Sequence, residues 1–190
     1  MYTLSGPSEG LYKERGSRFV SYAAPARNRE EAEAVVRRLR AEHPDSRHVC
    51  YAFRFGEEKM CSDAGEPAHS AGDPILRVAL SAKLTHVVFV VVRYFGGVKL
   101  GVPGLIRAYS AAAQAALAQN VVVPFVPTRR ISLVFDYAQT SAVKKIMDKF
   151  RIVESGYDER CRYVVELPES DWEATARALA QARIECMDLG

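Results

Sequence analysis

Residues 85–110 read THVVFVVVRYFGGVKLGVPGLIRAYS, and three kinds of local pattern follow one another in them. Residues 85–92 are almost all β-branched or aromatic, which is typical of a strand buried on both faces. Residues 105–117 carry apolar side chains at helical spacing, with Pro103 suited to the first turn of a helix. A glycine-rich loop separates the two patterns. The segment therefore predicts a buried strand that passes through a tight loop into a helix.

The glycine-rich loop is also the first candidate binding site. Glycine lets backbone N–H groups approach a ligand, and the positive end of a helix dipole favours an anion. The spacing matches neither GxxxxGK[ST] nor GxGxxG, so a nucleotide site does not follow. A tight crossing that needs glycine only for close packing is the open alternative. The candidates for anion or RNA binding are Arg93, Gly96, Gly97, Lys99, Gly101, Gly104 and Arg107.

A second candidate lies in the loop 61–72, CSDAGEPAHSAG. Asp63, Glu66 and His69 are titratable groups in one short segment, as general acid–base chemistry requires. The structural alternative is that Asp63 and Ser70 accept or donate hydrogen bonds to backbone groups within turns. A pocket that joined this loop to Lys99 would favour an enzyme.

Metal binding was weighed for His48 and Cys50, which share a face if their segment is an alternating strand. Cys61 and His69 would have to complete the set. Structural zinc sites usually show two closely spaced ligand pairs, and only one pair is present here. A packed Cys50 and a hydrogen-bonded His48 are the favoured alternative. We therefore predict no metal and no cofactor.

Charge is unevenly distributed along the 190 residues, although the net charge is only +3. No acidic residue occurs between Pro74 and Phe135. Such a segment fits an anionic partner, or it reflects buried elements that contain few acids. The seven basic residues in it are Arg77, Lys83, Arg93, Lys99, Arg107, Arg129 and Arg130.

The composition favours a cytoplasmic location. The four cysteines show no CxxC pair and are interpreted as reduced thiols. Residues 1–10 are polar and lack an apolar signal core. The longest apolar run, residues 87–92, is far too short to cross a membrane, so no membrane partner is expected.

The chain is expected to form two domains of the α+β class. Residues 1–10 are interpreted as a flexible arm, 11–122 as the first domain and 123–128 as a proline-bounded linker. Residues 129–190 show the order β-α-β-β-α-β, which is the ferredoxin-like arrangement. Within the first domain, Asn28 is expected to cap a helix, residues 60–72 to form a loop, and Asp73-Pro74 to open a helix that ends near Leu84.

Residues 93–110 closely resemble the signature of the YigZ/IMPACT family. Three further segments support the resemblance, which covers about residues 10–120: residues 16–19 (GSRF), 48–52 (HVCYA) and 62–67 (SDAGEP). The chain departs from the family pattern at Val102 and Pro103, where a glycine and a small residue are usual. It departs also at Ala64, where a second acidic residue is usual, which weakens a mechanism based on paired acids.

The resemblance implies a first domain with the fold of a ribosomal small-subunit protein's second domain. It implies a second domain similar to the last domain of elongation factor G. Both of these relatives contact RNA on the ribosome, and the eukaryotic family members regulate translation by binding a large activator of a starvation-responsive kinase. Fold analogy alone does not fix a function.

The leading hypothesis is a non-catalytic protein that binds RNA or ribosome-associated factors and influences translation. One alternative is a small hydrolase or transferase that uses Asp63, Glu66 and His69. Another is a regulator that acts only through protein–protein contacts, which a basic face free of acids would argue against. The oligomeric state is left open.

Overall fold

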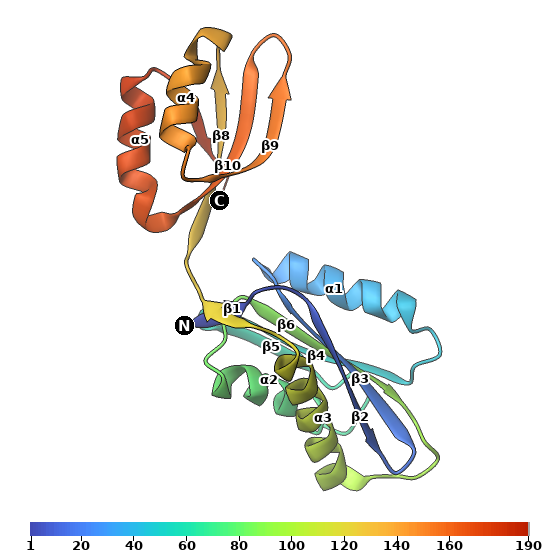
Figure 1. The fold of residues 1–190 in the computed structure, drawn as a ribbon. Helices are drawn as coiled ribbons and strands as arrows, with labels where there is room; N and C mark the ends of the chain where they lie inside the picture. The colour runs from blue at the N-terminus through green and yellow to red at the C-terminus, as the bar shows by residue number, and fades with distance from the viewer. Residues whose placement is uncertain (190) are drawn as a thin grey trace. The chain divides into compact units, whose positions relative to one another are not determined.

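The computed structural model describes residues 1–189, and the chain divides into two compact units, Met1–Phe125 and the residues from Val126 onward (Figure 1). Each unit has its own core. The strands of the first unit are β1 (Tyr2–Leu4), β2 (Ser8–Glu14), β3 (Ser17–Pro25), β4 (His48–Phe55), β5 (Glu58–Ser62), β6 (Val87–Tyr94) and β7 (Val122–Pro124). Its helices are α1 (Arg29–Glu42), α2 (Gly72–Ser81) and α3 (Gly101–Ala118).

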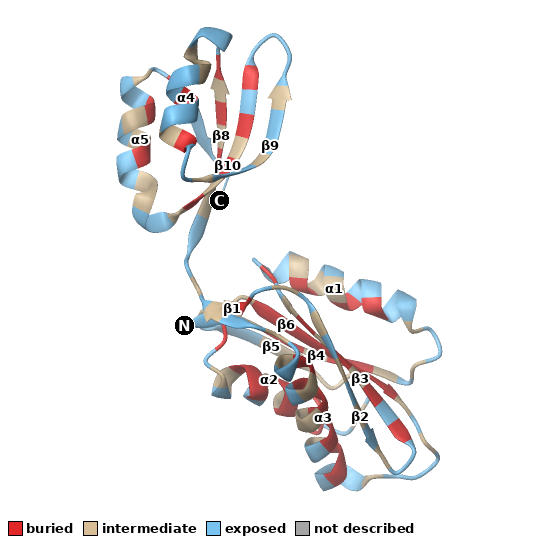
Figure 2. Cartoon of the chain, viewed as in Figure 1, coloured by how far each residue is buried: buried red, intermediate tan, exposed pale blue. Residues whose placement is uncertain are grey.

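The main sheet of the first unit has the strand order β2-β3-β6-β4-β5, with every neighbouring pair antiparallel. Helix α1 covers one face, and α2 and α3 cover the other (Figures 1 and 2). Side chains of β6 alternate between the two faces: Phe89 and Val91 join the core beneath α2 and α3, whereas Val88 and Val90 join the core beneath α1. The prediction that this strand is buried on both faces is confirmed.

The expected flexible arm at residues 1–10 is wrong. β1 pairs with β7, and β2 pairs with β3 along its whole length. Leu4 is buried in the core, so the segment contributes apolar contacts. The polar residues around Leu4 explain why the sequence did not indicate this burial. Gly10 lets α3 approach β2 closely, because a Cβ there would lie 2.4 Å from the backbone nitrogen of Ala116. The first two residues of the expected linker, Val123 and Pro124, likewise belong to strand β7 of the first unit.

Two element boundaries also differ from expectation. Residues 58–62 form strand β5, which sequence reasoning assigned partly to a loop. Helix α2 begins at Gly72 and ends at Ser81, with Ala71 rather than Asp73 at the N-cap position. The reason is that Asp63 supplies the capping interactions from outside the helix, as described below. The expected N-cap at Asn28 is confirmed, since its side chain accepts a hydrogen bond from the Glu31 amide.

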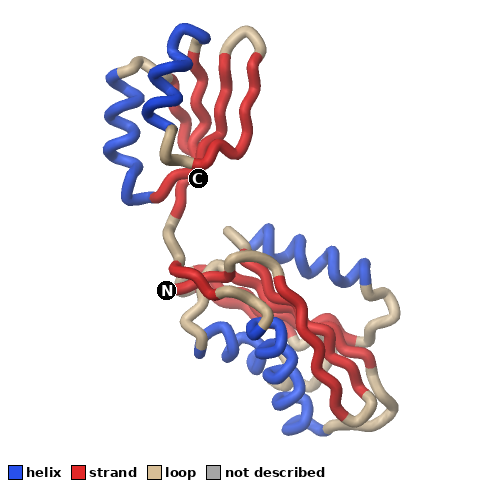
Figure 3. Tube along the Cα trace, viewed as in Figure 1, coloured by secondary structure: helices blue, strands red, loops and turns tan. Residues whose placement is uncertain are grey.

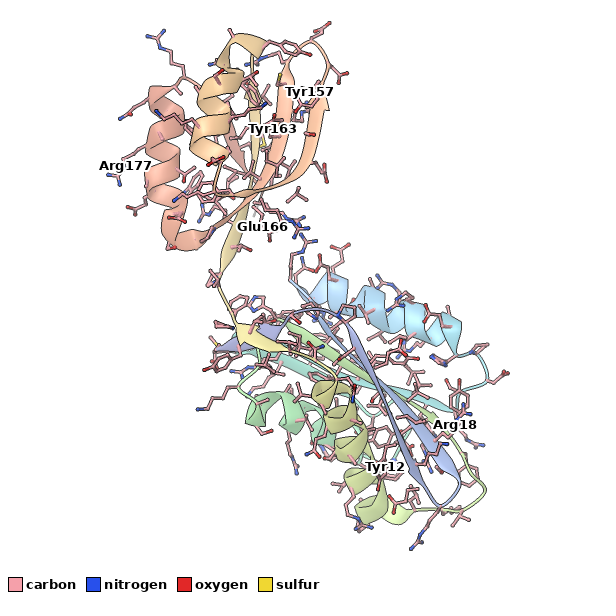
Figure 4. The ribbon with its side chains drawn as sticks, viewed as in Figure 1. Tyr12, Arg18, Tyr157, Tyr163, Glu166 and Arg177 are labelled. Atoms are coloured by element: carbon pink, nitrogen blue, oxygen red, sulfur yellow. The ribbon has the colours of Figure 1, made fainter. Side chains whose placement is uncertain are left out.

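The second unit is a four-stranded antiparallel sheet in the order β11-β8-β10-β9, with its two α-helices on one face (Figure 3). This is the expected β-α-β-β-α-β order. On neighbouring strands, the hydroxyls of Tyr157 and Tyr163 lie 2.8 Å apart (Figure 4). The elements are β8 (Thr128–Phe135), a 3₁₀ turn (Tyr137–Gln139), α4 (Thr140–Met147), β9 (Arg151–Tyr157), β10 (Cys161–Pro168), a 3₁₀ turn (Glu169–Asp171), α5 (Trp172–Gln181) and β11 (Glu185–Asp188).

Candidate anion-binding cavity

A cavity of about 450 Å³ lies at the N-terminus of α3, where the glycine-rich loop meets the loop 62–72. Its volume falls within the range of small-molecule sites. One wall is polar and the other is largely apolar. The polar lining residues are Arg47, His48, Glu66, Arg93 and Lys99. The remaining lining residues are Pro67, Phe95, Leu100, Gly101, Val102 and Leu105.

Arg93 is placed by the alternation of β6 on the same face as Phe89 and Val91, beneath α3. Its side chain is only 7% exposed, and its Nη1 donates to Glu66 Oε1 at 2.6 Å. Arg93, one of the candidates for anion binding, is therefore not a surface cation, because its charge is balanced by Glu66 in a buried ion pair. Arg93 Nε is also buried, and it has no hydrogen-bond partner among residues 1–189.

Glu66 is the acceptor that holds this cluster together. Its side chain is 4% exposed, and Oε1 also accepts a hydrogen bond from the Tyr109 hydroxyl at 2.8 Å. Burial raises the pKa of Tyr109 and raises the pKa of the nearby Cys50 thiol to about 12. Both groups therefore stay protonated at neutral pH, and Cys50 is not an activated nucleophile.

His48 lies directly opposite Arg93 in the β4–β6 register and shares its face. Its Nδ1 lies 2.9 Å from the carbonyl oxygen of Ala64. Because a carbonyl only accepts, Nδ1 carries the proton, and in the neutral ring Nε2 is left as an acceptor. Nε2 lies 3.9 Å from Glu66 Oε1. The sequence favoured a hydrogen-bonded His48 over a metal ligand, and the contact with the Ala64 carbonyl agrees with that interpretation.

The three residues of the proposed acid–base set do not converge. The Asp63 carboxylate accepts backbone hydrogen bonds from His69 at 2.8 Å and from Ala71 and Gly72 at 2.9 Å each. Burial alone would raise the pKa of Asp63, but these amides outweigh it and hold that pKa below its usual range. His69 is exposed, and its Nδ1 lies 2.6 Å from Asp73 Oδ2. Only Glu66 of the three lines the cavity.

The structural alternative for this loop is confirmed, because Asp63 satisfies the amides that begin α2. Ser70 behaves similarly, with its hydroxyl donating to the Pro67 carbonyl at 2.6 Å. Within residues 1–189, no group of three or more His, Cys, Asp or Glu side chains is arranged to hold a metal ion.

The four glycines of the loop have different roles. Gly96 packs against the β2–β3 turn, where a Cβ would lie 1.9 Å from the carbonyl carbon of Gly16. Gly104 is buried within α3. Gly101 lines the cavity and has a φ of +69°, a conformation that favours glycine. Gly97 lies in open space with a φ of +86°. Gly96 therefore serves close packing, whereas Gly101 forms part of the cavity wall.

The other two cationic candidates are exposed, but only one of them faces the cavity. Lys99 lines it together with Arg47, which sequence reasoning did not select. Neither of these side chains forms an ion pair with any residue in the described chain, 1–189. Arg107 lies in the second turn of α3, which begins at Gly101, and it is not part of the cavity lining.

The fold and the cavity define a two-unit α+β protein with a ligand-sized, mixed polar and apolar cavity at the N-terminus of α3 in its first unit. The family model for the Impact N-terminal domain matches residues 15–117, and the chain belongs to the IMPACT family. Among the helices of residues 1–189, none is long and apolar enough to span a membrane.

The curated relatives are similar over most of their length. The IMPACT family member YigZ of Escherichia coli strain K12 is 35% identical over 159 residues, covering 80% of this chain and 78% of that protein. The IMPACT family member in the pol 5′ region of Thermus thermophilus is 38% identical over 154 residues, covering 80% and 84%. A solved structure of a hypothetical protein shares the fold of the whole chain, with a TM-score of 0.70, 29% identity and coverage of 100% and 97%.

Proposed function

We propose that this IMPACT family protein is a non-catalytic binding protein that contacts single-stranded RNA through the cavity and acts in translation. The observation that carries the proposal is the exposed ring of Phe95 in a cavity that is also lined by Arg47 and Lys99, two cations for which no acidic partner is found among residues 1–189. Proteins that bind single strands combine exactly these parts: a positively charged groove for the backbone and an aromatic platform for the bases. The role in translation rests on the family resemblance alone.

Phe95 is 46% exposed, which is unusual for a large apolar side chain at the end of a buried strand. The Arg93 guanidinium lies 5.6 Å from the centre of the Phe95 ring, and this cation–π contact stabilises the position of the ring. Lys99 and Arg47 line the same cavity. A nucleotide stacked on Phe95 would thus have its phosphate within reach of these cations.

An enzyme built on Asp63, Glu66 and His69 is not favoured. The cavity does join the loop 62–72 to Lys99, as that alternative requires. However, Asp63 is committed to the start of α2, and His69 is exposed beside Asp73. Glu66 is already neutralised by Arg93. A set of groups with separate structural tasks does not act as an acid–base pair.

The test is a fluorescence-anisotropy titration of labelled single-stranded RNA at several salt concentrations. If Arg47 and Lys99 each meet one phosphate, the log–log salt slope should be about −1.4. Lys99→Ala should make the slope about 0.7 shallower. Phe95→Ala should weaken binding about tenfold, through lost stacking.

A matched control removes the same charge away from the cavity. The pair Arg47→Ala/Lys99→Ala should abolish most binding, whereas Lys59→Ala/Arg107→Ala should retain it, since neither Lys59 nor Arg107 lines the cavity. Equal losses in the two double variants would show that general positive charge, not the cavity, attracts RNA. Absence of RNA binding by the wild-type protein would overturn the proposal and favour a regulator that contacts proteins only.

A further inference from the structure

Resting on the proposed function, we infer that the cavity selects a nucleotide that bears a phosphate monoester, as found at an RNA end or on a free mononucleotide. The inference concerns which phosphate is recognised. An internal phosphodiester carries one negative charge, whereas a phosphate monoester carries nearly two at neutral pH. Three features of the cavity favour the phosphate monoester.

The first feature is the open N-terminus of α3. This 18-residue helix has Leu100 at its N-cap, with no side chain capping it and no acidic residue in its first turn. Helix α1, by contrast, is capped by Asn28 and carries Glu30 and Glu31. The first N–H groups of a helix have no acceptor within the helix. In α3 these groups lie at the cavity, which Gly101 and Val102 line. An anion satisfies such amides.

The second feature is Arg93. Its side chain is more than nine-tenths buried and lines the cavity, yet its Nε lacks a hydrogen-bond partner among residues 1–189. Buried donors without partners are rare because desolvation without a hydrogen bond is costly. Only Nη1 of this guanidinium is engaged by Glu66. The cavity wall formed by Arg93 therefore contains a buried donor that no acceptor among residues 1–189 satisfies.

The third feature is the balance of charge. The single carboxylate in the lining, Glu66, is offset by Arg93. Lys99, Arg47 and the positive end of α3 remain, together equivalent to roughly two and a half positive charges. This excess matches the dianion of a monoester and exceeds the single charge of a diester.

The remaining lining accommodates the rest of one nucleotide. A volume of about 450 Å³ is at the small end of ligand sites and too small for a duplex. Phe95 offers a face to a base, and Val102 and Leu105 supply apolar contact. The Nδ1–H of His48 donates to the Ala64 carbonyl, so in the neutral ring Nε2 can receive a hydrogen bond from an exocyclic amino group.

The experiment compares one single-stranded RNA sequence in three forms: with a 5′-phosphate, with a 3′-phosphate, and with hydroxyls at both ends. At least one phosphorylated form should bind about tenfold more tightly, as expected for an added charge-assisted contact. Lys99→Ala should remove this preference, and Arg107→Ala should keep it. A nucleoside 5′-monophosphate should compete better than the corresponding nucleoside, and inorganic phosphate should compete weakly.

The outcomes separate the two proposals. If all three RNA forms bind equally, the inference fails while RNA binding stands. If no RNA binds but the nucleoside monophosphate shifts the amide resonances of Gly101 and Val102, the RNA proposal fails while the monoester site stands. If neither RNA nor the monophosphate binds, both are wrong. A preference that persists in Lys99→Ala would place the phosphate outside this cavity and overturn the inference.

Discussion

Glu66 in the first unit and Glu169 in the second each meet an arginine at nearly the same distance, 2.6 Å to Arg93 and 2.5 Å to Arg129. Their surroundings differ greatly: the Glu66 side chain is 4% exposed, and that of Glu169 is 48% exposed. A short distance therefore says little about what an ion pair contributes. Burial decides how much an ion pair contributes to stability, because a buried charge that loses its partner cannot be hydrated instead.

The strongest test of this contrast is Glu66→Ala. The substitution leaves the buried Arg93 without its counter-charge and Tyr109 without its acceptor. We expect the first unit to lose about 3–5 kcal/mol of unfolding free energy. Urea unfolding, monitored by amide resonances of each unit separately, measures the loss and shows whether the second unit is unaffected.

The double variant Glu66→Leu/Arg93→Met sharpens that test. Replacing both partners with apolar residues removes the desolvation cost together with the attraction, so most of the lost stability should return. If the double variant is as unstable as Glu66→Ala, the cluster contributes through its shape and hydrogen bonds rather than through charge balance. That result would weaken the comparison between the two glutamates.

Asp63 is an intermediate case, since it is half-buried and neutralised by three amides rather than by a cation. Asp63→Ala should cost about 2 kcal/mol of unfolding free energy at pH 7, through lost charge-assisted hydrogen bonds at the start of α2. Urea unfolding of the wild type and the variant measures this difference. A loss as large as that in Glu66→Ala would show that exposure does not order these carboxylates.

The unfolding free energies of the wild type and of Asp63→Ala should also differ in their pH dependence, and the sign of this difference is expected from the pKa of Asp63. The pKa of Asp63 in the folded protein lies below its usual range, so its contribution is complete above the unfolded pKa. The contribution is then lost as the pH falls through the folded pKa. The difference in unfolding free energy between wild type and Asp63→Ala should thus be constant from about pH 7 to pH 5 and shrink below about pH 4. A difference that stays constant into acid would contradict this assignment.

Secondary structure was predicted most reliably from the sequence in segments where one local pattern repeats. β6 was predicted because successive β-branched residues suit a strand covered on both faces, and the second unit because its six elements follow in unbroken order. β1 was missed because three residues among polar neighbours carry no period, and their partner β7 lies at the far end of the first unit. Long-range pairing of this kind has no local signal.

The candidate site was only partly predictable for the same reason. Lys99 and Gly101 were expected in the loop before the helix, and both line the cavity because strand end, loop and first helical turn are adjacent in sequence; Gly101 is the first residue of α3. The burial of Arg93 was not expected, since an arginine is rarely buried without a partner and its partner Glu66 lies 27 residues away. Arg47 was missed because it lies on another segment, brought to the cavity only by the pairing of β4 with β6.

Glu169→Ala should have the smallest effect of the three carboxylate substitutions. Arg129 also contacts Asp188 at 2.7 Å, and its guanidinium lies 4.8 Å from the centre of the Trp172 ring. Loss of one exposed partner therefore leaves Arg129 with two others and with access to water. We expect a urea midpoint for the second unit that is indistinguishable from wild type, at low and at high salt.

A loss comparable to that of Glu66→Ala would mean that the ends of β8 and β11 depend on this pair, because Arg129 joins Glu169 to Asp188. In that case, the geometry of the three-residue contact would outweigh exposure, and the contrast between the two glutamates would have to be argued from network structure instead of burial.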